Sequence, residues 1–290
     1  MTRTQANLIL VTITISWGTS YIFMKMAADT MSAFSIVALR FGIAFILMFL
    51  LFYKKMLKVD RRTLQYSFVL GALLAATFIV FIAGVRTTSA SVAGFLTSTT
   101  VMFVPLFQMI ITRKLPVRKI RIAVLLAFIG LLLFSIKGDF SLSTGALLCL
   151  AGAAIYGVYI IVTNKFAKEV DAFVLGIYQL GFTGVIALMF VFIAQTPLTP
   201  PSKMEWIAVL GLAIICTAYG TTMQPVAQKY TTAENTGFIF ALEPLFAAGF
   251  AFILLNETLT GQEYIGAAFI LISVLIANYT PREKKVVSTS

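Results

Sequence analysis

The segment GFIFALEPLFAAGFAFILLNE, residues 237–257, is an almost continuous apolar run with a single acid, Glu243, near its centre. The proline Pro244 follows that acid directly. About 20 apolar residues are enough for an α-helix to cross the ~30 Å hydrocarbon core of a membrane. Because a charge in hydrocarbon is costly, acids in such helices usually face the bundle interior or a water-filled space. The segment therefore predicts a membrane-spanning helix with a polar group at mid-depth.

The whole chain shares this apolar character. Of its 290 residues, 60% are hydrophobic and 11% are charged, and the mean hydropathy is +0.97. Soluble domains carry about 25% charged residues. Strands of a membrane barrel would alternate apolar and polar residues, so we interpret the long apolar runs as transmembrane helices. There are ten such runs, at about 6–27, 32–53, 66–84, 89–112, 119–136, 143–163, 172–194, 205–225, 232–255 and 262–279.

The net charge of +11 gathers on one side of this predicted bundle. Connections on the same side as the N-terminus hold two basic groups, Lys54-Lys55-Lys58-Arg61-Arg62 and Arg113-Lys114-Arg118-Lys119-Arg121. Loops rich in Lys and Arg remain in the cytoplasm. We therefore predict that both termini are cytoplasmic, and the positive charge does not indicate a nucleic-acid partner.

The chain also repeats itself. TTSASVAGFLTSTTVMFVPLF, from Thr87, aligns with YTTAENTGFIFALEPLFAAGF, from Tyr230, so that Gly94 meets Gly237. Each copy contains five predicted helices, and an odd number places the second copy upside down in the membrane. The aligned residues Lys114 and Glu257 differ in charge, as positions on opposite membrane faces should.

The repeat defines the predicted organisation: an all-α polytopic membrane protein with ten transmembrane helices in two inverted five-helix repeats. The first repeat covers residues 1–138, the second covers residues 139–281, and residues 282–290 form a basic cytoplasmic tail. The two cysteines lie within apolar runs and there is no histidine. Neither a disulfide framework nor a metal site is therefore expected.

Several segments resemble one known family. They are SWGTSYIFMK from Ser16, ALRFGIAFILMF from Ala38, GFLTSTTVMFVPLF from Gly94, and the run from Gly237 to Ile276. In this order, and with the repeat, they resemble the EamA-like branch of the drug/metabolite transporter superfamily. The resemblance implies a secondary transporter of small metabolites, often an exporter of amino acids or related compounds, with a central cavity between the halves. One departure is Lys114, where the family often has an acid.

Glu243 is the leading candidate for a functional residue. It lies about eleven residues into its helix, or ~16 Å from one end, near the membrane midplane. As a functional acid it would bind substrate or exchange a proton for it. The alternative is an acid that is protonated or hydrogen-bonded to a neighbouring helix and only holds the bundle together.

Further cavity candidates are aromatic or polar residues well inside their predicted helices, away from an interfacial aromatic belt. Hydroxyls bonded to their own helix and amides that join helices are the structural alternatives for the polar members. Prolines inside helices mark kinks near the site. The cavity candidates are Trp17, Tyr21, Phe78, Ser98, Thr99, Tyr156, Tyr159, Tyr219, Gln224, Phe240 and Glu243, and the kink candidates are Pro105, Pro225 and Pro244. Arg40 is interpreted first as a structural pair or an outer-gate residue, and alternatively as an attractor of anionic substrates.

The sequence thus predicts a facilitative or secondary active transporter in the cell membrane, working by alternating access and most simply as an exporter. Its expected partners are a small-molecule substrate, the lipid bilayer and protons. We expect a monomer, no cofactor and no enzymatic activity. The alternative is a proton-coupled exporter of lipophilic cations or drugs. A channel and a membrane-embedded enzyme are weaker hypotheses, because no ring of charges and no nucleophile with a base is evident.

Overall fold

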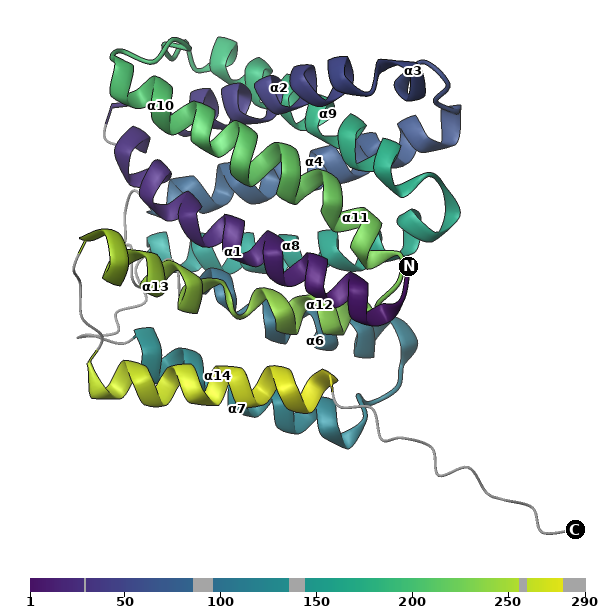
Figure 1. Ribbon diagram of the computed structural model, residues 1–290, viewed down its shortest axis with the longest axis vertical. Helices are drawn as coiled ribbons and strands as arrows, with labels where there is room; N and C mark the ends of the chain where they lie inside the picture. Colours follow the sequence, from purple (N-terminus) through teal and green to yellow (C-terminus); the bar gives the residue numbers. More distant parts are fainter. Residues whose placement is uncertain (29, 86–95, 136–143, 256–259, 279–290) are drawn as a thin grey trace, which may run out of the picture.

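The computed structural model describes residues 1–28, 30–85, 96–135, 144–255 and 260–278, and all regular structure in these ranges is helical (Figure 1). The elements are α1 (Arg3–Ala28), α2 (Ala33–Leu51), α3 (Tyr53–Met56), α4 (Arg61–Val85), α6 (Thr100–Thr112), α7 (Arg118–Ser135), α8 (Thr144–Glu169), α9 (Ala172–Ile193), α10 (Lys203–Gly211), the π-helix η1 (Leu212–Thr221), α11 (Thr222–Gln228), α12 (Ala233–Phe240), α13 (Glu243–Leu255) and α14 (Gly261–Asn278).

Several helices have the length and composition of membrane spans. In the described residues, five helical stretches are long and apolar enough to cross a bilayer, and two shorter apolar helices accompany them. Large apolar side chains cover the outside of the bundle. Phe192, Ile193 and Leu275, for example, are 72%, 73% and 69% exposed. Because a soluble protein avoids such extended apolar surfaces, the chain is a multi-pass membrane protein whose outer face contacts lipid.

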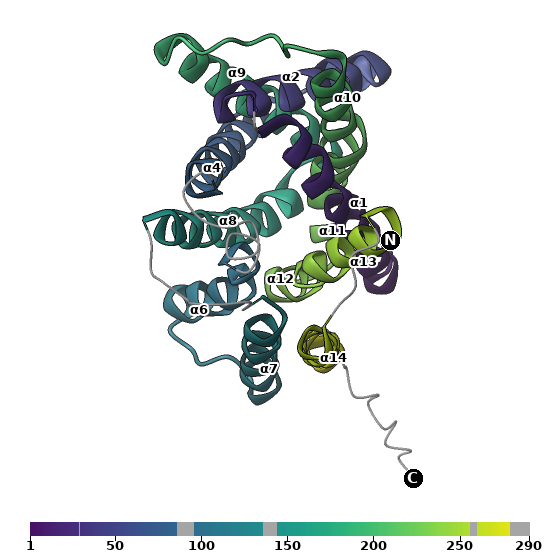
Figure 2. The same ribbon diagram turned by 90° about the vertical axis from the view of Figure 1, so that its left-hand side faces the viewer.

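The helices lie side by side and pack in a reciprocal pattern (Figure 2). α8 packs against α4 and α6, and α1 packs in the same way against η1 and α13. α4 contacts α9, and η1 likewise contacts α2. The remaining close pairs, α2 with α9, α6 with α12 and α7 with α14, each join elements in corresponding places along the two halves of the chain. The larger helix–helix contacts therefore recur between the two halves of the chain.

Two long helical stretches are interrupted, at residues that align with each other in the sequence repeat. The predicted helix over residues 232–255 is divided, because α12 ends at Phe240 and α13 begins at Glu243. Pro244 explains the break, since a proline ring clashes with the carbonyl four residues earlier but is tolerated in the first turn of a helix. In the first half the chain makes a turn at Thr99, immediately before α6. Thr99 aligns with Leu242 in the sequence repeat.

The predicted helix over residues 205–225 is also not regular. Its middle is the π-helix η1, which joins α10 to α11. π-helical turns often occur at functional sites. Pro225 lies inside α11, and the backbone carbonyl four residues before it, at Thr221, accepts a hydrogen bond of 2.9 Å from the Gln179 side chain. Gln179 therefore satisfies the carbonyl that the proline frees.

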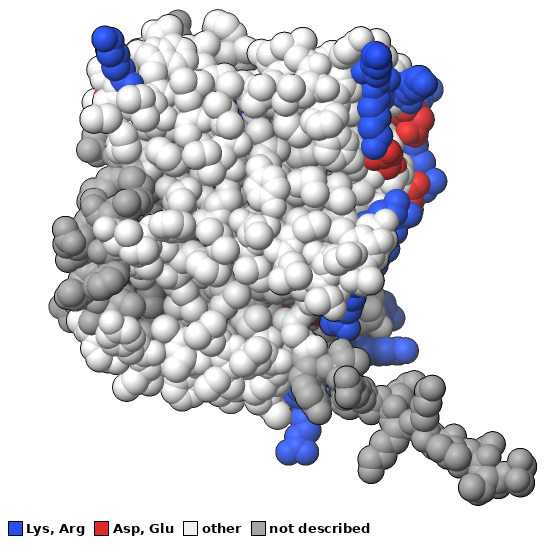
Figure 3. Space-filling model, in the orientation of Figure 1, with Lys and Arg blue, Asp and Glu red and all other residues white. Residues whose placement is uncertain are grey.

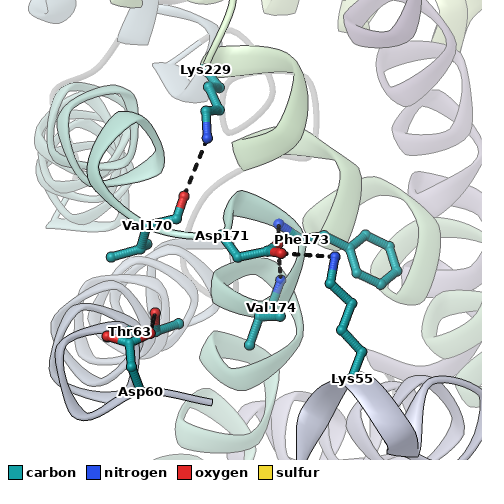
Figure 4. Close-up of polar contacts among 8 residues, drawn as sticks. All are labelled: Lys55, Asp60, Thr63, Val170, Asp171, Phe173, Val174 and Lys229. Carbon is teal, nitrogen blue, oxygen red and sulfur yellow. Dashed lines mark hydrogen bonds and ion pairs between the residues drawn. The ribbon is translucent and has the colours of Figure 1, made fainter. Parts of the chain in front are cut away.

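Charged side chains gather at one end of the bundle. Figure 3 shows Lys and Arg concentrated along one edge, which in Figure 1 is the end that holds the N-terminus. Asp171 caps the first turn of α9 there by accepting bonds from the backbone N–H groups of Phe173 and Val174, and it pairs with Lys55 at 2.8 Å (Figure 4). Burial raises the pKa of the Asp171 carboxyl, but Lys55 and the two N–H groups more than offset this, so the pKa lies below its usual value.

Candidate functional site

A cavity of about 80 Å³ lies deep among the helices. A space of this size holds only a few water molecules. Its walls come from α1, α2, α4, the helical residues 96–98 before α6, α8, η1, α11 and α13, so both halves of the chain contribute to it. The lining residues are Trp17, Ser20, Met24, Arg40, Leu74, Thr77, Phe78, Phe81, Thr97, Gly152, Tyr156, Thr221, Gln224 and Glu243.

Arg40, on α2, brings a buried positive charge to this cavity. Its side chain is 3% exposed, and its Nε donates a 2.9 Å hydrogen bond to Thr217 Oγ1 in η1. The guanidinium carbon lies 4.9 Å from the ring centre of Phe78 and 5.2 Å from that of Phe41. Cation–π attraction of this kind partly compensates the loss of water around the charge. In the described part of the chain the Nη groups of Arg40 have no hydrogen-bond acceptor.

The π-helix η1 positions both Arg40 and Trp17. The Thr217 hydroxyl that accepts from Arg40 also donates to the Leu212 carbonyl, five residues earlier. The Trp17 indole Nε1 donates a 3.0 Å bond to the Cys216 carbonyl. Gly220 makes room for the indole, since a Cβ on this residue would lie 2.4 Å from Trp17 Nε1. η1 therefore provides the polar anchors of two cavity side chains, the Thr217 hydroxyl for Arg40 and the Cys216 carbonyl for Trp17.

Glu243 lines the same cavity from the first turn of α13. The N-terminus of a helix carries a partial positive charge, which favours a carboxylate in its first turn. Arg40 and Glu243 are also close enough to interact electrostatically. The cavity thus contains one basic and one acidic side chain, from α2 and α13.

Aromatic rings form part of the cavity wall. The ring centres of Trp17 and Tyr156 are 6.3 Å apart in an edge-to-face arrangement. Phe240 packs behind them, 4.8 Å from Trp17 and 6.4 Å from Tyr156, measured between ring centres. Tyr159 stacks on Tyr156 at 5.4 Å. This stack fixes the orientation of the two rings that face the cavity.

Gln224 is the most unusual polar group of the site. It is fully buried, and its Oε1 accepts bonds from the hydroxyls of Tyr159 at 3.4 Å and Tyr156 at 3.5 Å. Its Nε2 has no hydrogen-bond partner in the described residues. Buried polar atoms nearly always have a partner, because leaving one unmade costs about 1–3 kcal/mol. Since Gln224 lines the cavity, a bound polar group or water is the natural partner.

The structure brings six of the predicted candidates to the cavity and places the others elsewhere. Trp17, Phe78, Tyr156, Gln224 and Glu243 line it, and Pro244 lies beside Glu243 at the start of α13.

The others have different surroundings. Tyr159 and Phe240 lie behind the cavity wall, buried among neighbouring rings. Tyr219 is 39% exposed on the outside of η1, where its hydroxyl lies 2.6 Å from that of Thr12. Thr99 donates to the Leu96 carbonyl.

Ser98 is half-buried but does not line the cavity. Pro105 is enclosed within α6 and Pro225 within α11. The side chain of Tyr21 lies outside the described residues.

Sequence reasoning missed Arg40 as a cavity residue. It also missed the smaller lining residues Thr77 and Thr221. The charge of Arg40 inside an apolar run was the available signal. The sequence alone does not give the depth of α2 relative to the other helices, so it indicates a structural pair or an outer-gate residue and not a cavity residue. In the described residues, no group of three or more Cys, Asp or Glu residues lies close enough to hold a metal ion.

Comparisons with known proteins agree with this architecture. A family model described as the EamA-like transporter family matches the chain twice, at residues 4–136 and 143–279. The chain belongs to the EamA-like transporter family. An uncharacterized transporter of Archaeoglobus fulgidus is 29% identical to this EamA-like protein over 281 residues, covering 95% of this chain and 86% of the relative. An uncharacterized transporter of Clostridium kluyveri is 26% identical, covering 95% of each chain.

A solved structure shares the fold of this EamA-like protein. It has a TM-score of 0.77 and 19% sequence identity, and the match covers 96% of this chain and 97% of the other. The family and the relatives are transporters, which agrees with a transport role. They do not specify a substrate or a direction.

Proposed function

We propose that this EamA-like protein carries a small zwitterionic metabolite, of the amino-acid class, across the cytoplasmic membrane by alternating access, most simply as an exporter. One observation carries the proposal: Arg40 and Glu243 line the same cavity. A zwitterion presents a carboxylate and an ammonium group at a short fixed separation. A cavity with one guanidinium and one carboxylate complements both, so neither buried charge needs a separate counter-ion.

Arg40 and Gln224 would bind the substrate carboxylate. The Nη groups of Arg40 are available for a two-pronged hydrogen bond, which is the geometry that a carboxylate accepts best. The unpartnered Nε2 of Gln224 offers a further donor on the same cavity. Thr217 and the rings of Phe41 and Phe78 hold the guanidinium in place, so little side-chain freedom is lost on binding.

Glu243 would bind the ammonium group, with the faces of Trp17 and Tyr156 beside it. Aromatic rings attract cations through their π-electron density, and a desolvated contact contributes about 2 kcal/mol. The cavity of about 80 Å³ is smaller than common ligand pockets of ~300–1,000 Å³. Substrate entry therefore requires the walls to separate, which alternating access provides by rocking one half against the other.

The topology of the proposal is ten membrane spans in two inverted repeats, residues 1–138 and 139–281, with residues 282–290 as a cytoplasmic tail and both termini in the cytoplasm. The two matches to the family model support two units. The reciprocal packing of the helices and the corresponding breaks at Thr99 and after Phe240 support their symmetry. The concentration of Lys and Arg at one end supports the orientation. A fluorescent protein fused to the C-terminus should therefore remain in the cytoplasm.

Coupling to protons would use Glu243. In an exchange mechanism the acid binds either a proton or the substrate ammonium, so each transported molecule moves against a proton. A facilitative carrier would use the same residue for substrate alone. The two mechanisms differ only in whether a pH gradient drives accumulation.

The test is counterflow exchange in proteoliposomes with three related compounds: an amino acid, the amine left by its decarboxylation, and the acid left by its deamination. We expect fast exchange of the amino acid alone. Glu243→Gln and Arg40→Gln should each reduce that exchange by at least tenfold, because each leaves one buried charge of the substrate unpaired. Glu234→Gln is the matched control, since this acid lies in the first turn of α12 and does not line the cavity.

Each outcome has a defined meaning. If the amine or lipophilic cations exchange as fast as the amino acid, the drug-exporter alternative replaces the proposal. Single-channel current steps would exclude a carrier. If Glu243→Gln exchanges normally but loses uptake driven by a pH gradient, the acid is the proton site and not the ammonium site.

A further inference from the structure

A second and larger hollow lies at the outside of the bundle, between α6 and α7, and we call it the α6–α7 crevice. Its volume is about 570 Å³, within the range of small-molecule pockets. The walls are apolar, with Met102, Leu106 and Met109 on α6 facing Val124 and Phe128 on α7. Apolar side chains beside it are well exposed, so the crevice opens toward the lipid and not toward the central cavity.

One end of the α6–α7 crevice is positively charged. Arg121, in the first turn of α7, is the one charged residue among those that line it. Four more basic residues lie nearby in the sequence: Arg113 and Lys114 directly follow α6, and Arg118 and Lys119 begin α7. The sequence contains no acid from residue 96 to residue 135. Residues 96–135 therefore contribute no carboxylate beside Arg121.

The crevice has the depth of one bilayer leaflet. Arg121 and Leu132 both line it, and they are eleven residues apart on α7, which corresponds to ~16 Å along a helix axis. Half of the ~30 Å hydrocarbon core is ~15 Å. A lipid chain lying in the crevice would therefore reach the bilayer centre while its headgroup remained beside Arg121.

We infer that the α6–α7 crevice binds one anionic phospholipid, with an acyl chain between the two helices and the headgroup phosphate on Arg121. The apolar walls complement the chain, and a guanidinium complements a phosphate through paired hydrogen bonds. Anionic lipids are attracted to basic segments at the cytoplasmic leaflet, where each Lys or Arg contributes about 1 kcal/mol. A neutral hydrophobic solute would have no group for Arg121 to bind at the basic end of the crevice.

The second half of the chain lacks the charged part of this arrangement. No Lys or Arg occurs from Pro244 to Pro281, which includes α13 and α14. The inferred lipid site therefore belongs to the first half alone. Its inner wall includes Leu96 and Thr99, which flank the cavity residue Thr97 in one turn. A bound lipid would pack against the outer side of a turn whose inner side faces the central cavity.

The inference is tested by titrating the purified protein with phosphatidylglycerol or phosphatidylcholine and counting bound lipids by native mass spectrometry. We expect one high-affinity phosphatidylglycerol per chain. Arg121→Gln should weaken its binding about fivefold, the loss expected for one cation at the membrane surface. Lys58→Gln removes one charge from an exposed lysine in the turn after α3, at the same end of the bundle, and should leave this affinity unchanged.

A second pair of variants tests the acyl-chain site. Val124→Trp fills the crevice and should remove the high-affinity lipid, whereas Leu125→Trp adds the same bulk to a neighbouring side chain that is 58% exposed and does not line it. Equal losses in Arg121→Gln and Lys58→Gln would refute a specific headgroup site. Equal affinity for phosphatidylcholine, or a dimer in place of bound lipid, would also overturn the inference. Arg121 is exposed, so its variant retains the fold and remains informative even if Val124→Trp does not.

Discussion

Replacing Thr217 with valine tests how the protein holds its central guanidinium. The Thr217 hydroxyl is fully buried in η1 and accepts the 2.9 Å bond from Arg40 Nε. Valine has nearly the same shape but cannot accept that bond. The charge of Arg40 would remain in the cavity, and its orientation would be lost.

The magnitude follows from the charge of the donor. A hydrogen bond to a charged group contributes about 1.5–3 kcal/mol, and 1.4 kcal/mol corresponds to a factor of ten in affinity. If the bond holds Arg40 in its substrate-binding orientation, Thr217→Val should raise the KM for a zwitterionic substrate about tenfold or more. The maximal rate should change less, because Glu243 and the aromatic wall remain intact.

The assay is concentration-dependent uptake into proteoliposomes, with Thr183→Val as the matched control. Thr183 is also fully buried, and its hydroxyl bonds the carbonyls of Gly71 and Gln179 between α9 and α4. Both variants lose one buried hydroxyl, but Thr183 does not line the cavity or contact Arg40. A KM for Thr217→Val within about twofold of that for Thr183→Val would refute the positioning role.

Three further predictions address other parts of the fold. Gly220→Ala places a Cβ 2.4 Å from the position of Trp17 Nε1, so the indole must move. In a Trp206→Phe background Trp17 is the one remaining tryptophan, and its fluorescence emission should shift while substrate exchange falls. An unchanged emission spectrum would contradict the contact between Gly220 and Trp17. Gly176→Ala puts a Cβ 2.4 Å from the Thr222 carbonyl oxygen and should lower the melting temperature. In the control variant Gly249→Ala the new Cβ meets no atom within 4 Å, so the melting temperature should be unchanged or higher. Equal melting temperatures for the two variants would exclude close packing of α9 on α11. Because the pKa of Asp171 is lowered in the folded state, its stabilising effect is complete above the unfolded value of about 4 and is lost as the pH falls through the lower folded value. Asp171→Asn should therefore reduce the loss of thermal stability between neutral and acid pH, and an unchanged pH profile would contradict this role.

The sequence predicted the helical class because the apolar runs and the charged breaks each act over about 20 residues. The same local signal located the interruption at Pro244, where one residue type has one strong backbone effect. It also indicated Glu243, because an acid in an apolar run has few places to lie. These predictions needed no knowledge of how distant helices pack.

The cavity lining depends on packing and was harder to predict. Tyr156 and Tyr159 are three residues apart on α8 and were indistinguishable in the sequence, but one lines the cavity and the other lies behind it. Tyr219 is near Gln224 in the chain, yet it faces outward because η1 changes the angular spacing of side chains. Arg40 is held at the cavity by the contact of α2 with η1, where its bond to Thr217 links positions 177 residues apart.

The π-helix η1 also has a consequence for motion. A π-helical turn contains about one residue more than an α-helical turn, so relaxing it to α-helix would shift the following residues by one position. One position corresponds to a rotation of ~100° and a rise of ~1.5 Å in an α-helix. Such a ratchet in η1 would turn Gln224 away from its present direction and withdraw Thr217 from Arg40, dismantling the carboxylate end of the cavity in a single step. The hold on the substrate carboxylate would then be lost through one change of helical register as the two halves rock.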